Sequence, residues 1–145
     1  MDAEFVTRFM NEVRQGAPAD EARRGNHRIL TSLYDALIRG DYEGFGQLLA
    51  DDVELDIRGA GPMDGKWTGR RPVLEAVRAN FSQLAEQRPE IECMLWERDC
   101  AAVLFRESGK FHHEGRDYRA RVVQWFTFGG GKVTKIDEIV AMSTA

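Results

Sequence analysis

The chain has 145 residues, of which 43% are hydrophobic and 30% are charged, and its formal net charge is −4. This balance is typical of a globular domain and excludes low-complexity and collagen-like chains, and no basic stripe is present to bind nucleic acid. We therefore expect a single domain over residues 1–145, with a core and room for one modest pocket.

The N-terminal sequence and the cysteines indicate a cytoplasmic protein. The segment from Met1 to Phe5 is acidic and lacks a long apolar run, so we expect no signal peptide. No run approaches roughly 18 apolar residues, so we expect no membrane span. Cys93 and Cys100 are the only cysteines and lack the C-x-x-C spacing, which favours reduced thiols.

The N-terminal third of the chain has the periodicity of helices. Phe5, Phe9 and Val13 recur every four residues and predict an amphipathic helix within residues 1–20. A second helix is expected to end at Gly40. Its apolar stripe consists of Ile29, Leu30, Leu33 and Leu37. Asp41 is a suitable N-cap for a short third helix.

The apolar period changes after the third helix. Val53, Leu55 and Ile57 alternate with charged residues and predict a strand. A glycine-rich loop from Gly59 to Gly69 is expected next, followed by a helix in whose first turn Pro72 lies. The buried stripe predicted for that helix consists of Leu74, Val77, Phe81 and Leu84.

The remainder of the chain, from Arg88 onward, is predicted to be extended. The expected strands cover residues 91–96, 101–105, 118–128 and 133–140, and the triple glycine Gly129–Gly131 forms the last turn. Helices, a strand, a helix and then a run of strands predict an α+β fold. In such a fold the helices lie against one face of a curved antiparallel sheet.

Two polar residues interrupt the apolar faces of the last two strands. Side chains alternate across a strand, so one face over residues 118–128 is apolar except for Gln124. One face over residues 133–140 is apolar except for Glu138. Burial would raise the pKa of this carboxyl toward the range useful for proton transfer, and an amide can orient a carbonyl or the carboxylate. We therefore predict that Glu138 and Gln124 are the catalytic residues of a pocket.

Other interpretations of the polar residues stay open. Glu138 could lie in water at an open rim or pair with an arginine such as Arg106. Glu107 and His113 share a face with Phe105 and could reach the pocket mouth, although a solvated hairpin end is the favoured interpretation. No nucleophile elbow, P-loop or dinucleotide fingerprint is present.

The walls of the pocket are expected to be apolar. The residues predicted to bind substrate are Leu33, Ile57, Trp67, Phe105, Val122, Phe126, Ile136 and Val140. Trp67 could cover the pocket from the glycine-rich loop, or serve as a packing anchor. Strand alternation places Thr134 on the same face as Glu138, and Val133 on the opposite face. We expect no metal site and no required cofactor, because His112 and His113 are adjacent on a strand and point to opposite faces.

Two stretches carry a resemblance to a known family. The run from Leu33 to Val53 contains a helix, Gly-Asp, a short helix ending in Leu-Ala-Asp-Asp and a strand. The closing run from Val122 to Val140 contains the triple glycine. Together with the helix from Arg71, they resemble SnoaL-like proteins of the NTF2-like superfamily, which includes ketosteroid isomerases and polyketide cyclases. The resemblance covers roughly residues 28–142 and leaves out the first helix.

The resemblance implies a fold and a partner. It implies a cone-like curved sheet wrapped around helices, an NTF2-like or cystatin-like barrel, with a deep pocket for a small hydrophobic molecule. It also implies a homodimer formed through the convex sheet face, where Val123 and Trp125 would lie.

The resemblance also bears on the site residues. By ungapped register the tyrosine, aspartate base and acidic oxyanion donor of ketosteroid isomerases fall on Leu33, Ile57 and Gln124, so that machinery is not expected. The acidic base and the histidine of SnoaL-like polyketide cyclases fall on Glu138 and Gln124. The carboxylate is kept and the histidine is replaced by an amide.

These observations predict a small cofactor-independent enzyme of the SnoaL-like type. Glu138 would remove a proton next to a carbonyl of a hydrophobic substrate, and Gln124 would hold the enolate oxygen or position the base. An isomerase, a cyclase or a hydratase or hydrolase would fit. The alternatives are a non-catalytic ligand-binding protein and a protein-interaction module that uses the sheet face around Trp125.

Overall fold

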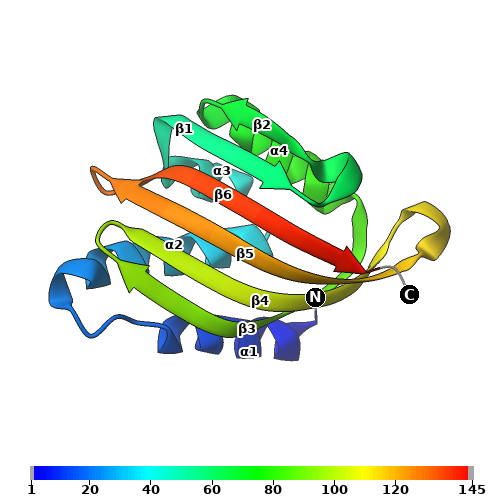
Figure 1. The fold of residues 1–145 in the computed structure, drawn as a ribbon, viewed down its shortest axis with the longest axis horizontal. Coiled ribbons are helices and arrows are strands. Elements are labelled where there is room, and N and C mark those ends of the chain that lie inside the picture. Colours follow the sequence, from blue (N-terminus) through cyan, green and yellow to red (C-terminus); the bar gives the residue numbers. More distant parts are fainter. Residues whose placement is uncertain (1, 144–145) are drawn as a thin grey trace.

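The computed structural model describes residues 2–143, which form one curved sheet with helices beside it (Figure 1). The helices are α1 (Ala3–Gln15), α2 (Glu21–Ile38), α3 (Tyr42–Gln47) and α4 (Arg70–Ser82), with short 3-10 turns η1 (Gly61–Met63) and η2 (His113–Gly115). The strands are β1 (Leu49–Arg58), β2 (Gly65–Thr68), β3 (Leu84–Glu97), β4 (Cys100–Phe111), β5 (Asp117–Gly129) and β6 (Lys132–Ser143). The α+β fold with a curved sheet is confirmed.

The helices follow the predicted stripes, with small differences at their ends. The Asp41 carboxylate accepts a hydrogen bond from the backbone N–H of Gly44 at 2.9 Å and so caps α3 as expected. Helix α4 begins directly after Gly69, whose φ of +99° suits a glycine. Leu84 was expected on the stripe of that helix, but it lies at the start of β3. No helix within residues 2–143 is long and apolar enough to cross a membrane.

The sheet differs from the all-antiparallel arrangement that we expected. Its strand order is β2-β1-β6-β5-β4-β3, and it is not closed into a barrel. Strands β1 and β6 pair in parallel, whereas the other neighbours are antiparallel. The first strand, β1, pairs with the last strand, β6. These strands are distant in the chain, and the alternation of residues within one strand does not predict such a pairing. The parallel pair places Ile57 opposite Glu138.

The glycine-rich segment after β1 is more ordered than the predicted loop. Residues 65–68 form β2, which pairs with β1 at the edge of the sheet and sets Trp67 opposite Leu55. Trp67 is partly buried and packs against the hydrophobic core. The indole therefore belongs to an edge strand rather than to a loop.

The turn between β5 and β6 and the irregularity after it set which residues face the helices. Gly130 and Gly131 have φ values of +59° and +76°, as the two central residues of a tight hairpin turn require. The register then shifts by one residue, leaving Thr134 as an extra residue of β6. Val133 is consequently fully buried, although alternation placed it on the outer face. Beyond this bulge Glu138 lies opposite Gln124.

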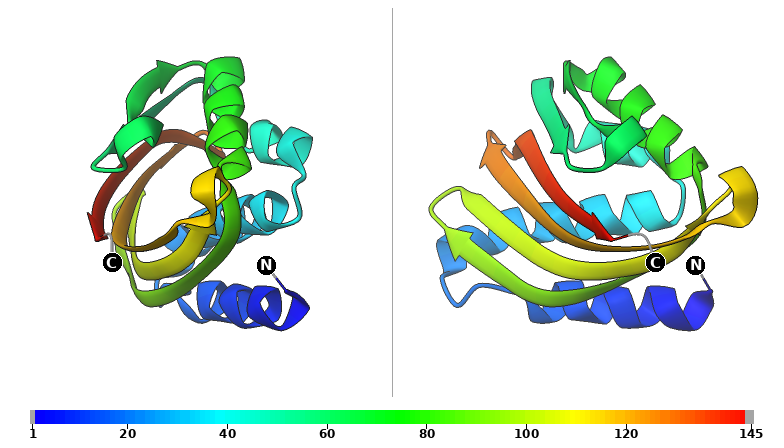
Figure 2. Two further views of the ribbon diagram at one scale, coloured as in Figure 1. Left: turned by 90° about the vertical axis from the view of Figure 1, so that its right-hand side faces the viewer. Right: turned by 45° about the vertical axis from the view of Figure 1, so that its right-hand side comes forward.

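Helix α1 lies along the edge strand β3 (Figure 2). The indole Nε1 of Trp96 donates to the backbone oxygen of Gly16 at 2.9 Å, and the backbone N–H of Ile91 donates to the Glu12 carboxylate at 2.9 Å. Phe9 and Val13 on the inner side of this helix are buried. These contacts cover part of the exposed edge of the sheet and fix the helix to the core.

We predict that the burial of one face of α1 stabilises the whole domain. Phe9→Ala should lower the free energy of unfolding by about 3–5 kcal/mol, because it removes a large buried side chain from the core. Phe5→Ala on the same helix is the control, because Phe5 is only partly buried and should cost less than about 1 kcal/mol. Urea denaturation measures both values. Equal losses would show that α1 is not docked as described.

Candidate functional site

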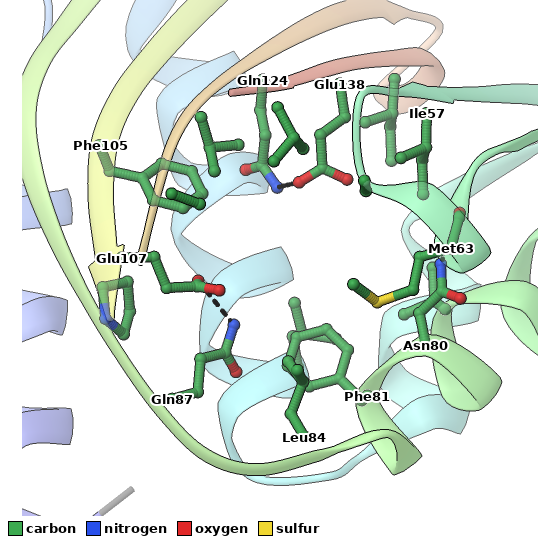
Figure 3. Close-up of a pocket in the computed structure, with 18 of the residues that line it drawn as sticks. Ile57, Met63, Asn80, Phe81, Leu84, Gln87, Phe105, Glu107, Gln124 and Glu138 are labelled. Atoms are coloured by element: carbon green, nitrogen blue, oxygen red, sulfur yellow. Dashed lines mark hydrogen bonds between the residues drawn. The ribbon is translucent and has the colours of Figure 1, made fainter. Parts of the chain in front are cut away.

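The concave side of the sheet and the helices enclose a cavity of about 150 Å³ with largely apolar walls (Figure 3). Most of the apolar residues predicted to bind substrate line this cavity, namely Leu33, Ile57, Phe105, Val122, Phe126, Ile136 and Val140. Trp67 is not among the lining residues, because it packs on β2 at the sheet edge. Phe9 was not among the residues predicted to bind substrate, but it comes from α1 and forms part of the cavity wall.

Both residues predicted to be catalytic lie in the wall of the cavity and contact each other. The side-chain N–H₂ of Gln124 donates to Oε1 of Glu138 at 3.1 Å. The hydroxyl of Tyr34 donates to Oε1 of Gln124 at 2.5 Å. Because the amide oxygen accepts from the tyrosine, its nitrogen faces the carboxylate. A chain of hydrogen bonds therefore runs from α2 through β5 to β6.

The surroundings of Glu138 disfavour its charged form. Burial raises the pKa of this carboxyl to about 7; the hydrogen bond from Gln124 opposes the shift, and the charge of Glu107 adds to it. Burial, together with the charge of Glu138, raises the pKa of Tyr34 well above its usual range, so the phenol stays protonated and acts as a donor. A carboxyl with a pKa near neutrality is suited to take up and release protons at physiological pH.

Tyr34 is a site residue that the sequence comparison missed by one position. Ungapped register placed the tyrosine of ketosteroid isomerases on Leu33, which lines the cavity but has no polar group. Tyr34 packs edge-on against Phe9 and Phe126, with ring centroids 5.5 and 5.9 Å apart. Its position four residues after Leu30 places it on the apolar stripe of α2, a helical spacing that could have identified it.

Glu107 is a second carboxylate inside the cavity, which corrects the solvated interpretation of this residue. Its Oε2 accepts from the hydroxyl of Tyr118 at 2.7 Å, and its Oε1 accepts from the side-chain N–H₂ of Gln87 at 2.9 Å. Burial raises the pKa of Glu107, while these two hydrogen bonds oppose the shift. Figure 3 shows its carboxylate directed into the cavity. His113 is exposed, so the favoured interpretation holds for this residue.

Gly109 explains how Tyr118 reaches Glu107. A Cβ atom at Gly109 would lie 2.7 Å from the phenol ring and 2.2 Å from the backbone oxygen of Glu86. Only glycine lets the ring cross the strand at this point. A glycine within a strand is a known sign of such a close approach, but the predicted strand ended at residue 105, so the signal at Gly109 was not recognised.

The arginine that could have neutralised Glu138 is elsewhere. Arg106 points to the outer face of the sheet, where its guanidinium pairs with Glu92 at 2.9 Å. The pairing of Glu138 with Arg106 that the sequence left open is therefore wrong. Within residues 2–143 no group of three or more His, Cys, Asp or Glu side chains is arranged to hold a metal ion.

Comparison with known proteins identifies a family and a fold. A family model described as "SnoaL-like domain" matches residues 30–136, inside the range 28–142 over which the sequence resembles that family. No protein with a curated description matches the chain. Among solved structures, an NTF2-like protein from Burkholderia xenovorans superposes with a TM-score of 0.71 at 21% identity, covering 81% of this chain and 90% of that one.

Two further solved structures have the same fold. A protein from Rhodopseudomonas palustris that was provisionally named an isomerase has a TM-score of 0.68 at 23% identity, with coverage of 80% of this chain and 88% of that one. A protein from Catenulispora acidiphila with a ketosteroid isomerase-like fold was solved in complex with trimethylamine. It has a TM-score of 0.64 at 14% identity and covers 76% of this chain and 82% of that one. These identities establish a common architecture.

We predict that the buried carboxyl of Glu138 costs stability at high pH. Its folded pKa of about 7 lies above the ordinary value of 4.5, so stability falls as the pH rises from about 4.5 to 7, a range in which the unfolded chain releases this proton and the folded protein still holds it. Glu138→Gln does not ionise. Relative to the unaltered protein, its free energy of unfolding should increase by about 2–3 kcal/mol between pH 5 and pH 8.

Urea denaturation at the two pH values measures this difference. Glu86→Gln is the matched control, because Glu86 lies exposed on β3 and the substitution removes the same charge. A difference between Glu138→Gln and the unaltered protein that does not change with pH would contradict the prediction.

Proposed function

Because the chain belongs to the SnoaL-like domain family, we propose that its cavity is the active site of a small enzyme that moves a proton next to a carbonyl group. In this proposal Glu138 is the base and Gln124 positions it. The substrate is a small hydrophobic carbonyl compound, and the reaction is an isomerisation or a cyclisation. The observation that carries the proposal is the hydrogen bond from Gln124 to a buried carboxyl whose pKa is about 7.

The proposed step uses atoms that already face the cavity. The Glu138 carboxylate takes a proton from the carbon next to the carbonyl, so the C–H bond breaks, an O–H bond forms and the electron pair moves into an enolate. Gln124 uses one side-chain N–H for Glu138, and its second N–H is free to hold the enolate oxygen. Return of the proton to another carbon completes an isomerisation. In a cyclisation the enolate carbon attacks a second carbonyl, whose π bond breaks, and the resulting alkoxide takes the proton from Glu138.

The walls of the cavity support this chemistry. They are apolar on most sides, so a bound substrate displaces water and hydrogen bonds to the developing negative charge become stronger. Tyr34 keeps the amide of Gln124 in one orientation and would act as a positioning residue for the base. In the same proposal the reaction requires no metal and no other cofactor.

A second candidate function is the binding of a small ligand without turnover. The structural neighbour from Catenulispora acidiphila was solved with trimethylamine, a small molecule, which favours ligand binding on this fold. In that case the cavity would hold an apolar molecule and Glu138 would serve only as a hydrogen-bonding group. The activity test below separates the two functions. The cytoplasmic location stays a prediction from the sequence.

We also propose that two copies of the chain pair through the convex face of the sheet. Leu95, Trp125 and Ile139 are large apolar residues with exposed fractions of 63%, 42% and 54%. They come from β3, β5 and β6, and they share the face opposite the cavity. Covering this group would remove apolar surface from water, as homodimer interfaces do.

We predict that Glu138→Gln abolishes proton abstraction. A suitable probe is 5-nitrobenzisoxazole, whose ring opens to a coloured phenolate when a base removes its C–H proton. The probe has no carbonyl, so it reports on the base alone. Loss of a positioned base should lower kcat/KM by about 10²–10⁴-fold. In the unaltered protein the rate should rise with pH with a midpoint of about 7, where Glu138 ionises.

Glu86→Gln is again the control and should leave the rate unchanged. Tyr34→Phe should lower kcat more than it changes KM, because it frees the amide of Gln124 and keeps the aromatic ring in the cavity wall. A rate for Glu138→Gln equal to that of the unaltered protein would remove this residue from the mechanism. Turnover no faster than in buffer would favour the ligand-binding function.

We predict that Ile139→Glu yields a monomer. A charge introduced into the apolar face should prevent its burial against a second copy. Ala79→Glu on the exposed side of α4 adds the same charge outside this face and should leave the dimer intact. Sedimentation velocity measures the mass of each variant. A monomeric unaltered protein would refute the dimer.

A further inference from the structure

The cavity contains two carboxylates and no side-chain cation. Glu107 from β4 and Glu138 from β6 both line it, and none of its lining residues within the described chain is Lys, Arg or His. The other titratable groups in its wall are Tyr34 and Tyr118, which burial keeps protonated. The parts of the wall from α1, α3, α4, β1 and β3 carry no charge. At least one negative charge inside the protein therefore lacks a cationic partner when these groups ionise.

Both carboxylates have free capacity to accept hydrogen bonds. A carboxylate offers about four lone-pair positions. Glu107 uses one position on each oxygen, for Tyr118 and Gln87. Glu138 uses one oxygen for Gln124, and within residues 2–143 its Oε2 has no hydrogen-bond partner. Figure 3 shows both carboxylates directed into the cavity, so each is open to a hydrogen-bond donor of a bound ligand.

The rest of the wall suits a cation with an apolar body. Aromatic rings line the cavity from several elements, namely Phe9, Phe45, Phe81, Phe105 and Phe126. Ring faces attract cations, most strongly where water is excluded. A cavity of about 150 Å³ holds a molecule about as large as benzene. The site therefore offers acceptors, aromatic side chains and space for at least one ring.

We propose that the cavity binds small apolar amines in their protonated form, with the ammonium group at Glu107 and the apolar body against the aromatic walls. This inference rests on the proposed function only in taking the cavity as the ligand site. Together, the two proposals describe the substrate as a carbonyl compound that also carries a basic amine.

The charges in the cavity favour a cationic ligand over an anionic or a neutral one. An anion would meet two carboxylates of its own sign and no cation. A neutral ligand would leave each carboxyl in one of two states. A protonated carboxyl cannot accept a proton, and an ionised one stays buried without a compensating charge, which is costly. An ammonium at Glu107 forms charge-assisted hydrogen bonds there and offsets the charge that acts on Glu138. The same ligand would therefore keep Glu138 ionised and ready to act as a base.

Isothermal titration calorimetry with two molecules of matched shape tests the inference. Benzylamine carries the cation, and benzyl alcohol is its neutral counterpart. At pH 8 benzylamine should bind at least about tenfold more tightly than benzyl alcohol. Glu107→Gln should lower the affinity for benzylamine by about tenfold or more and leave benzyl alcohol within about twofold. Glu86→Gln should change neither affinity.

A measurement on the unaltered protein keeps the inference testable if Glu107→Gln does not fold. Glu138 has a pKa of about 7 and burial raises the pKa of Glu107, so both carboxyls are more ionised at pH 8 than at pH 6. Benzylamine should therefore bind more tightly at pH 8 than at pH 6, and its binding should release protons. Titration in two buffers with different ionisation enthalpies counts those protons. Equal affinities for the two probes, no binding of benzylamine at millimolar concentration, or no effect of Glu107→Gln would overturn the inference.

The outcomes also separate this inference from the proposed function. Preferential binding of benzylamine without proton abstraction from 5-nitrobenzisoxazole would support the amine site and remove the catalytic role of Glu138. Proton abstraction that depends on Glu138, without a preference for benzylamine, would support the enzyme and remove the amine site.

Discussion

The cost of placing a charge on Glu138 is the constraint on which the arrangement of the cavity depends. Protein surrounds this carboxyl, and the partner provided for it is an amide rather than a cation. The amide is in turn held by the phenol of Tyr34. Helix α2 must therefore meet the hairpin of β5 and β6 with the polar atoms of all three elements in order. The fold holds these groups so that the carboxyl is neither fully ionised nor firmly protonated near neutral pH.

Part of this site could be predicted from the sequence because its signals are local. Alternation within two strands was sufficient to identify Gln124 and Glu138, and helical periodicity located the helices. For Glu107 the sequence favoured a solvated hairpin end, because its neighbours Arg106 and Ser108 have the polarity of such an end. Its burial depends on Gln87 and Tyr118, which come from strands on either side of β4. Side-chain contacts between different strands leave no trace in the pattern of one strand, and the same is true of the parallel pairing of β1 with β6.

Helix α1 contributes to the cavity although it precedes the family match at residues 30–136. The helix contributes Phe9 to the wall, and Phe9 packs edge-on against Tyr34. It is anchored by the hydrogen bond from Trp96 of the edge strand. The matched region therefore supplies Tyr34, Glu107 and Gln124, Glu138 follows it by two residues on β6, and α1 completes the apolar wall beside these polar groups. Differences in such flanking segments are one physical route by which members of a family come to hold different molecules.

The extra residue at Thr134 has a consequence for comparing relatives. If β6 continued from the glycine turn without this bulge, Asp137 would lie opposite Gln124 and Glu138 would turn to the outer face. In a relative whose hairpin pairs regularly, the acidic side chain that occupies the same place in space stands one position earlier when the two chains are aligned without a gap. Acidic residues of different family members should accordingly be compared by their place in the cavity, since a sequence alignment can pair a carboxylate that faces the cavity with one that faces outward.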